Sequence, residues 1–191
     1  MKNNLDFSQP LFKIPFSSGE KVCVQPYKEF AKGFCIGVSD ENANVVLRQN
    51  TRESFFVSPP DHSFSLKIEI EDTAQSKWLS LEGELDATHI YPNARLTALV
   101  ALSASTHSEI NLDLRLNRKS GGFKDLRIGT ICPKKNGEYT SATFSTPLGS
   151  LADIIRNDTE SARLILFLPV ESQQNISLHI FNIFLSDGEN E

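Results

Sequence analysis

The sequence has few of the residues that would indicate a disulfide scaffold or a nucleic-acid partner. Its 191 residues include only three cysteines, Cys23, Cys35 and Cys132, and no two of them form a CxxC pair. We expect all three to be reduced thiols that act as small apolar residues of the core. Nineteen Lys and Arg stand against 24 Asp and Glu, which gives a net charge of −5. Because a phosphate-binding surface needs clustered cations, the protein is not expected to bind nucleic acid.

Long apolar runs are absent as well. Spanning a bilayer takes about 18 consecutive apolar residues, and no segment reaches that length, so no membrane span is expected. The first residues, MKNNLDFSQPLFKIPF, contain charges and prolines where a signal peptide requires an apolar stretch. The expected location is therefore the cytoplasm.

Short motifs for catalysis or phosphate binding are also missing. The sequence has no GxSxG elbow, no Walker phosphate loop and no glycine triad between a strand and a helix. Its four histidines are not spaced with one another, or with a cysteine, as zinc ligands would be. Carboxylates are frequent, but a glycosidase needs two of them about 5–10 Å apart across a cleft, one of them protonated. A non-enzymatic protein is the favoured interpretation, and no cofactor is expected.

What the sequence does contain is a series of segments with the two-residue period of β-strands. SFSLKIEIE (63–71) and EINLDLRLN (109–117) alternate strictly between apolar and polar residues, which is typical of a sheet with one buried and one solvated face. Further strands are predicted over 20–25, 33–38, 44–48, 94–103, 124–132, 138–145, 162–168 and 175–185. Because strands do not alternate with helices, the fold class is all-β, an antiparallel two-sheet β-sandwich.

One short helix is predicted near residues 148–157, in STPLGSLADIIRND. Its apolar residues recur at helical spacing, and Ser150 is the expected N-cap. The sequence shows no internal repeat and no linker that would divide domains. We therefore expect a single sandwich domain over residues 1–191, with residues 1–19 as an N-terminal arm.

Two predicted strands are apolar on both faces. One is ARLTALVAL (94–102). In the other, NISLHIFNIFL (175–185), one face is expected to carry Ile176, Leu178, Ile180 and Phe184, and the opposite face Phe181, Ile183 and Leu185. Such strands are central in a sheet, and their second face is covered either by other parts of the chain or by another protein. A homodimer or a docked protein partner is therefore kept as an alternative.

The segment SDENAN places Asp40, Asn42 and Asn44 at alternate positions, as in the first half of a calcium-binding loop. Val45 stands where an EF-hand has its glycine, and Thr51 where it has its bidentate glutamate, so an EF-hand is excluded. Two interpretations are left, an Asp/Asn-rich turn and a loop that supplies oxygen ligands to a structural calcium ion.

The only tryptophan lies among polar residues in KWLSLEGELDA (77–87), where a two-residue period puts Trp78, Glu82 and Glu84 on one side. Proteins hold sugars with an aromatic ring against the C–H face and planar polar groups at the hydroxyls. A second polar strand face, at residues 111–117, would complete such a platform if the two strands are near neighbours. Alternatively, the indole only packs on a loop or on the helix. The candidate ligand-binding residues are Trp78, Glu82, Glu84, Asn111, Asp113 and Arg115.

Three features of the sequence carry a resemblance to a known fold. They are the hairpin of SFSLKIEIE and KWLSLEGELDA, the LDLRL strand with its GGFKD turn, and the closing ARLILFLPVESQQNISLHIFNIFLSD. In this combination, the chain from about residue 20 onward resembles the jelly-roll, galactose-binding-like β-sandwich of many carbohydrate-binding modules. The resemblance implies non-catalytic sugar binding on the concave face of one sheet, sometimes with a structural calcium. We expect such a module, accessory to polysaccharide synthesis or modification. A structural or protein-interaction module is the alternative, and a glycan-active hydrolase is the third.

Overall fold

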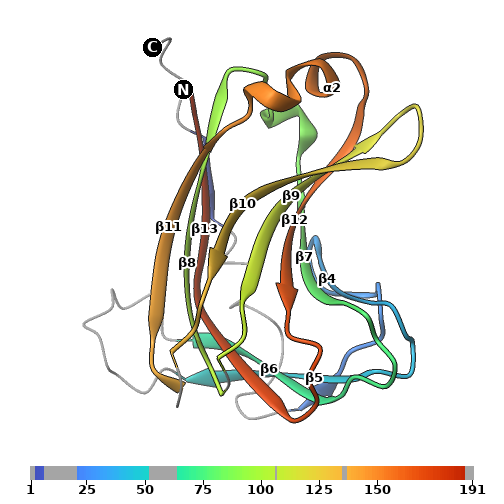
Figure 1. The fold of residues 1–191 in the computed structure, drawn as a ribbon, viewed down its shortest axis with the longest axis vertical. Coiled ribbons are helices and arrows are strands. Elements are labelled where there is room, and N and C mark those ends of the chain that lie inside the picture. The colour runs from blue at the N-terminus through green and yellow to red at the C-terminus, as the bar shows by residue number, and fades with distance from the viewer. Residues whose placement is uncertain (1–2, 7–20, 52–63, 106, 135–136, 188–191) are drawn as a thin grey trace.

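The computed structural model describes residues 3–6, 21–51, 64–105, 107–134 and 137–187. These residues form two antiparallel β-sheets that pack face to face, with helical turns at one end (Figure 1). The predicted two-sheet sandwich is therefore confirmed. Most of the predicted N-terminal arm lies outside the described residues, and the assignment of one domain to the whole chain stays a prediction.

The first sheet has seven strands, all antiparallel to their neighbours. In order across the sheet they are β11 (Thr140–Pro147), β8 (Ala94–Ala104), β13 (Gln174–Asp187), β6 (Phe64–Asp72), β5 (Asn44–Thr51) and β2 (Val22–Cys23). The seventh strand, β1 (Asn3–Asp6), was not predicted and pairs with the second half of β13.

The second sheet has six strands, which are also antiparallel. In order they are β10 (Phe123–Ile131), β9 (Ile110–Arg118), β12 (Thr159–Leu168), β7 (Leu79–Leu85), β4 (Phe34–Val38) and β3 (Glu29–Ala31). Apart from the short edge strand β3, each of these strands was predicted from its alternation, with ends that differ by a few residues.

The core lies between the sheets and contains the apolar half of each alternating strand. Along β9, for example, Ile110, Leu112, Leu114 and Leu116 are fully buried, while the residues between them face outward. The Phe144 ring of β11 lies against Gly129 of β10, so it joins the two sheets at one edge of the sandwich. Burial of these side chains is the main stabilising contribution to the fold.

The predicted faces of the last strand are correct up to Leu178 and wrong from Ile180 onward. The pairing of β13 with β8 shifts between Leu178 and Ile180, which marks a β-bulge at His179. A bulge adds one residue to a strand and reverses the alternation after it. Phe181 and Ile183 are therefore buried in the core, while Ile180 turns outward and is half-buried.

The predicted helix is confirmed as a 3-10 turn, η3 (Gly149–Leu151), that leads into α2 (Ala152–Asn157). Ser150 is not its N-cap, because the helical turn starts one residue earlier and no side chain caps it. A second 3-10 turn, η1 (Ala87–His89), follows β7 and is capped by the Asp86 carboxylate. Within the described ranges, no helix has the length and apolar character needed to cross a bilayer.

The turn between β9 and β10 is fixed by two glycines and one carboxylate. Gly121 and Gly122 have positive φ angles of 93° and 75°, which other residues adopt at a cost. Asp158, at the end of α2, accepts hydrogen bonds from the Ser120 backbone N–H (2.8 Å), the Ser120 hydroxyl (2.7 Å) and Arg118 Nε (2.7 Å). These bonds lower the pKa of Asp158 to about 2.

Removing one donor is expected to raise the pKa of Asp158. Because this pKa lies below its unfolded value, the turn contributes stability above about pH 3.9 that is lost as the pH falls toward 2. In Ser120→Ala, the Asp158 titration measured by NMR should move up toward 3.8. The control is Ser150→Ala, because Ser150 has no bond to Asp158. If Asp158 titrates with the same midpoint in both variants, the Ser120 hydroxyl does not lower its pKa.

A glycine in β7 makes room for a phenylalanine ring of the core. Gly83 lies opposite Phe34 of β4, and a Cβ atom at Gly83 would approach Phe34 Cε1 to 2.7 Å. Phe34 is 2% exposed, so its ring cannot move aside without displacing other core residues.

Gly83→Ala should therefore destabilise the fold by about 1–3 kcal/mol through overpacking. Gly149→Ala is the matched control, because a Cβ there would have no neighbour within 4 Å among the described residues, and it should change stability by less than about 0.5 kcal/mol. Urea unfolding followed by circular dichroism measures both. Equal midpoints for the two variants would show that Phe34 does not depend on this glycine.

Candidate functional site

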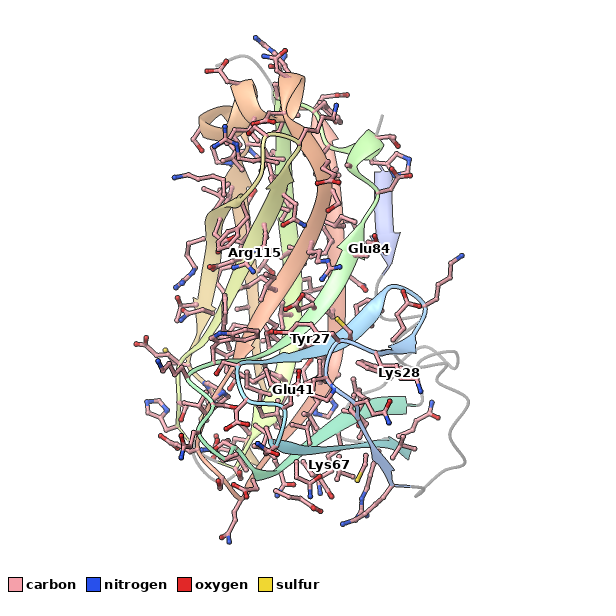
Figure 2. The ribbon with its side chains drawn as sticks, turned by 90° about the vertical axis from the view of Figure 1, so that its right-hand side faces the viewer. Tyr27, Lys28, Glu41, Lys67, Glu84 and Arg115 are labelled. Atoms are coloured by element: carbon pink, nitrogen blue, oxygen red, sulfur yellow. The ribbon has the colours of Figure 1, made fainter. Side chains whose placement is uncertain are left out.

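The outer face of the six-stranded sheet brings together most of the predicted ligand-binding residues. Asp113 of β9 lies opposite Ile165 of β12, and Ile165 lies opposite Glu82 of β7, so the three side chains share one face. The two predicted polar strands thus belong to one sheet face but are separated by β12. Figure 2 shows Glu84 and Arg115 on this side of the molecule, with Tyr27 below them.

Two nearly buried carboxylates lie in the floor of this face. Glu82 is 6% exposed; Arg163 Nη1 donates to its Oε2 (3.0 Å) and the Ser80 hydroxyl to its Oε1 (3.1 Å). Asp113 is also 6% exposed and accepts a hydrogen bond from Arg127 Nε. Because a buried charge is stable only when it is paired, each arginine belongs to the site as much as its carboxylate.

Arg115 makes the third ion pair of the face. Its Nε and Nη2 donate to the two carboxylate oxygens of Asp125 at 2.8 and 2.7 Å, a bidentate geometry that holds the guanidinium flat. The guanidinium also lies 3.9 Å above the ring centre of Phe123, which is exposed. The hydrogen bonds to Asp125 raise the pKa of Arg115.

Asn111 lies near the end of the same face, where the Thr130 hydroxyl donates to its Oδ1 (2.7 Å). Its half-buried side chain is next to Phe167 of β12, which lies opposite it in the register. Asn111 therefore keeps its amide N–H groups for other acceptors.

A hollow of about 230 Å³ opens on this face between β4 and β7, and we call it the β4–β7 hollow. Its lining residues are Tyr27, Glu29, Gly33, Phe34, Cys35, Glu82, Glu84 and Arg163. Three carboxylates and one guanidinium surround it, so the hollow is acidic. Burial, and next the charge of Glu82, raise the pKa values of both Cys35 and Tyr27.

Trp78 lies beside this hollow and is paired with a second aromatic ring. Its ring centre is 6.3 Å from that of Tyr27 in an edge-to-face arrangement with an angle of 67°. The indole lies over Gly37 of β4, where a Cβ atom would approach its Cζ3 to 3.0 Å. Tyr27 is 52% exposed and Trp78 is half-buried, so the pair is part of the surface and not of the core.

Tyr27 is held by the strand under it. Its backbone N–H donates to the Ile36 carbonyl and its hydroxyl to the Val38 carbonyl, both at 2.8 Å. It has a positive φ of 59°, an uncommon conformation for tyrosine that such contacts help to maintain. The candidate site residues predicted from the sequence did not include Tyr27, Arg163 or Cys35, because the alternation within one strand does not identify its neighbours. The expectation that all three cysteines are core residues is wrong, since Cys23 and Cys132 are exposed and Cys35 is half-buried.

The three residues predicted as calcium ligands all take part in side-chain hydrogen bonds within the protein. Asp40 Oδ1 accepts hydrogen bonds from the Asn42 backbone (3.0 Å) and side chain (2.9 Å), as in an Asp/Asn turn. Asn44 lies in β5 and donates to Glu71 (2.8 Å), away from that turn. In the part of the chain that the structure describes, no group of three or more His, Cys, Asp or Glu side chains is placed to hold a metal ion.

Comparison with known proteins identifies the fold. No protein-family model and no curated protein matches the sequence. Among solved structures, the Stig cyclase Fisc from Fischerella sp. TAU, in complex with (3Z)-3-(1-methyl-2-pyrrolidinylidene)-3H-indole, is similar with a TM-score of 0.63 and 13% identity. The match covers 99% of this chain and 100% of the cyclase.

Two carbohydrate-binding structures are also similar. The CBM22-1–CBM22-2 tandem of Paenibacillus barcinonensis Xyn10C has a TM-score of 0.56 and 9% identity, over 91% of this chain and 48% of the tandem. The family 11 carbohydrate-binding module of Clostridium thermocellum, in complex with a β-1,3-1,4-mixed-linked tetrasaccharide, has a TM-score of 0.53 and 10% identity, over 90% and 98%. The fold is a jelly-roll sandwich of the carbohydrate-binding-module type, as the sequence resemblance implied.

The electrostatics of the β4–β7 hollow are testable through Cys35. Glu82 raises the pKa of this thiol more than Glu84 does, so Glu82→Gln should increase the thiolate fraction and the alkylation rate at mildly alkaline pH. Glu84→Gln should have a smaller effect. Mass spectrometry measures the rate at Cys35, with the exposed Cys132 as internal reference. A larger effect of Glu84→Gln would contradict the described geometry.

Proposed function

We propose that the protein binds a carbohydrate chain, without cleaving it, on the outer face of its six-stranded sheet. The observation that carries this proposal is the surface aromatic pair of Trp78 and Tyr27 beside the β4–β7 hollow. A sugar places its C–H face against aromatic rings and its hydroxyls against planar polar groups. Both kinds of group occur here within a few ångströms of each other.

The polar groups that would contact the hydroxyls are on the neighbouring strands. Glu84 is exposed and, among the described residues, has no side-chain partner, so its oxygens are available as acceptors. Arg163 is 39% exposed and bonds Glu82 through one nitrogen, which leaves further donors for a ligand. Farther along the face, Arg115 and Asn111 offer additional donors, and Asp113 lies below Arg127 in the floor.

The fold comparison supports the same chemistry. Two of the similar structures are carbohydrate-binding modules, one of them with a bound tetrasaccharide. We further propose that the protein is accessory to enzymes that make or modify polysaccharide in the cytoplasm, an expectation that comes from the sequence. Two further expectations also remain predictions from the sequence: that the protein binds a structural calcium ion, and that it forms a homodimer or docks on a protein partner.

One observation favours binding over hydrolysis. Asp113 and Glu82 lie on the same sheet face, with β12 between their strands. Each of the two carboxylates also forms an ion pair with an arginine, whereas the general acid of a glycosidase starts the reaction protonated.

A second candidate is conversion of a small aromatic molecule in the β4–β7 hollow. It is favoured by the Stig cyclase, which matches over the whole length of both chains with a higher TM-score than the carbohydrate-binding modules. The buried Glu82 carboxylate and the Tyr27 ring would then face an aromatic substrate. Incubation with indole-containing substrates and mass spectrometry of the products separates this candidate from glycan binding.

Trp78→Ala tests the first proposal. A glycan array identifies the ligand, and calorimetry should then show at least about tenfold weaker binding, because truncating an aromatic anchor typically costs more than about 1.4 kcal/mol. Tyr139→Ala is the matched control, since Tyr139 is half-buried next to β11 of the other sheet. Bound ligand should also protect Cys35, but not Cys132, from alkylation. Unchanged affinity in a folded Trp78→Ala variant would refute the proposal.

A further inference from the structure

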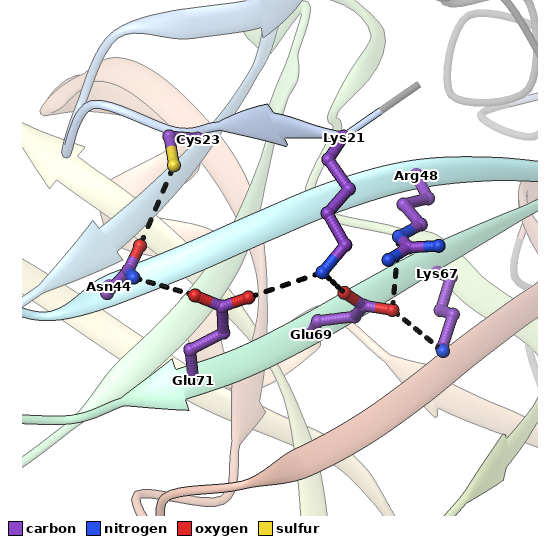
Figure 3. A network of polar contacts seen from close by, with 7 residues as sticks. All are labelled: Lys21, Cys23, Asn44, Arg48, Lys67, Glu69 and Glu71. Carbon is purple, nitrogen blue, oxygen red and sulfur yellow. Dashed lines mark hydrogen bonds and ion pairs between the residues drawn. The ribbon is translucent and has the colours of Figure 1, made fainter. Parts of the chain in front are cut away.

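The outer face of the seven-stranded sheet carries an unusual pair of like charges. Arg48 of β5 lies directly opposite Lys67 of β6, an arrangement that destabilises a sheet unless something compensates it. Lys21, just before β2, brings a third cation to the same place, as Figure 3 shows. All three cations surround the carboxylate of Glu69.

Glu69 is 8% exposed and is shared by the three cations. Its oxygens lie 2.8 Å from Lys67 Nζ, 3.2 Å from Arg48 Nε and 3.3 Å from Lys21 Nζ (Figure 3). Glu71 adds a second carboxylate, 3.5 Å from Lys21 Nζ and hydrogen-bonded by the Asn44 amide (2.8 Å). Counted over the residues that the structure describes, three cations against two carboxylates leave one positive charge in excess.

The six-stranded sheet shows what a balanced arrangement looks like. There, Arg115 lies opposite Arg163, but each has its own carboxylate, Asp125 and Glu82. Around Glu69, by contrast, Arg48 Nε is buried and its contact with Glu69 lacks hydrogen-bond geometry, so within the described part of the chain this donor has no acceptor. Leaving a buried donor unpaired costs free energy, which an additional acceptor would recover.

The cations line an open hollow of about 450 Å³, which we call the Glu69 hollow. Its lining residues are Lys21, Arg48, Lys67, Glu69, Ile70, Glu71, Gln173, Gln174 and Asn175. The amides of Gln173 and Asn175 on its rim are neutral groups that can bond hydroxyls or oxyanion oxygens. This hollow belongs to the opposite sheet from Trp78, so a ligand in it would not contact the β4–β7 hollow.

We propose that the Glu69 hollow binds an oxyanion, the carboxylate, sulfate or phosphate group of an acidic ligand. The oxyanion takes up the excess positive charge between Lys67, Lys21 and Arg48. The flexible ammonium groups of Lys67 and Lys21 turn from Glu69 toward the ligand, while Arg48 Nε gains the acceptor that it lacks. Glu69 is then an internal competitor that keeps the cations together and limits the affinity for the ligand.

Because Glu69 competes with the ligand for the cations, removing Glu69 and removing one of the cations should change the affinity for the ligand in opposite directions. Glu69→Gln removes the internal anion and should tighten binding of sulfate, whereas Lys67→Met should weaken it, each by about two- to fivefold for one partly exposed charge contact. A purely structural ion-pair cluster predicts no gain in Glu69→Gln. Lys124→Met, an exposed lysine of β10 on the other sheet, is the matched control and should leave sulfate binding unchanged.

The measurement must separate site binding from the general stabilising effect of sulfate on folded proteins. NMR titrations with sulfate, at an ionic strength held constant with chloride, follow the Nε–Hε resonance of Arg48. A second titration with a uronic-acid disaccharide distinguishes a sugar carboxylate from an inorganic or ester oxyanion. Saturable shifts with either probe, ordered from Glu69→Gln through wild type to Lys67→Met, support the proposal.

Equal shifts in Lys67→Met and Lys124→Met, or no gain in Glu69→Gln, would overturn it. If Glu69→Gln does not fold, Lys21→Met replaces it, because that side chain is 49% exposed and its loss should weaken sulfate binding without unfolding the protein. The outcome is independent of glycan binding at Trp78. Measuring sulfate binding in the Trp78→Ala variant therefore distinguishes a failure of the oxyanion proposal from a failure of the glycan proposal.

Discussion

Burial of one apolar face from each sheet against the other is the interaction on which the rest of this structure depends. The side chains concerned, such as Leu81, Leu114 and Ile183, are completely buried, and each contributes about 1.5–3 kcal/mol by leaving water. Since side chains alternate along a strand, this burial also decides which residues face outward. The polar residues of both outer faces are where they are because their neighbours are in the core.

Both outer faces have to accommodate carboxylates that neighbouring side chains shield from water. Glu82, Asp113 and Glu69 are each less than 9% exposed, and each is held by at least one cation from an adjacent strand or segment. The two sheets differ in their balance. The β4–β7 hollow has an excess of carboxylates next to two aromatic rings, whereas the Glu69 hollow has an excess of cations. The sandwich therefore presents surfaces of opposite local charge on its two sides, and these suit different ligand chemistries.

Most of the strands could be predicted because each is long enough to show its own period. Strands β6 and β9 alternate without interruption, and their predicted inward residues are all buried where side chains are described. The prediction failed where one residue interrupts the period. The bulge at His179 reverses the faces of β13, and nothing in that apolar segment distinguishes a bulged residue from a regular one. The start of the helical turn was also missed, because Leu148 precedes it without any capping side chain.

For the candidate site, the sequence by itself determined which residues face outward, since alternation is a local property of each strand. It placed Trp78, Glu82 and Glu84 together, and Asp113 with Arg115, before any neighbour was known. Only the tertiary structure decided that β12 lies between those two strands and that Arg163 pairs with Glu82. Only the tertiary structure brought Tyr27 to the indole, through hydrogen bonds to β4. Strand order depends on pairings between residues far apart in the chain, and these follow from how whole faces pack, which no short stretch of sequence encodes.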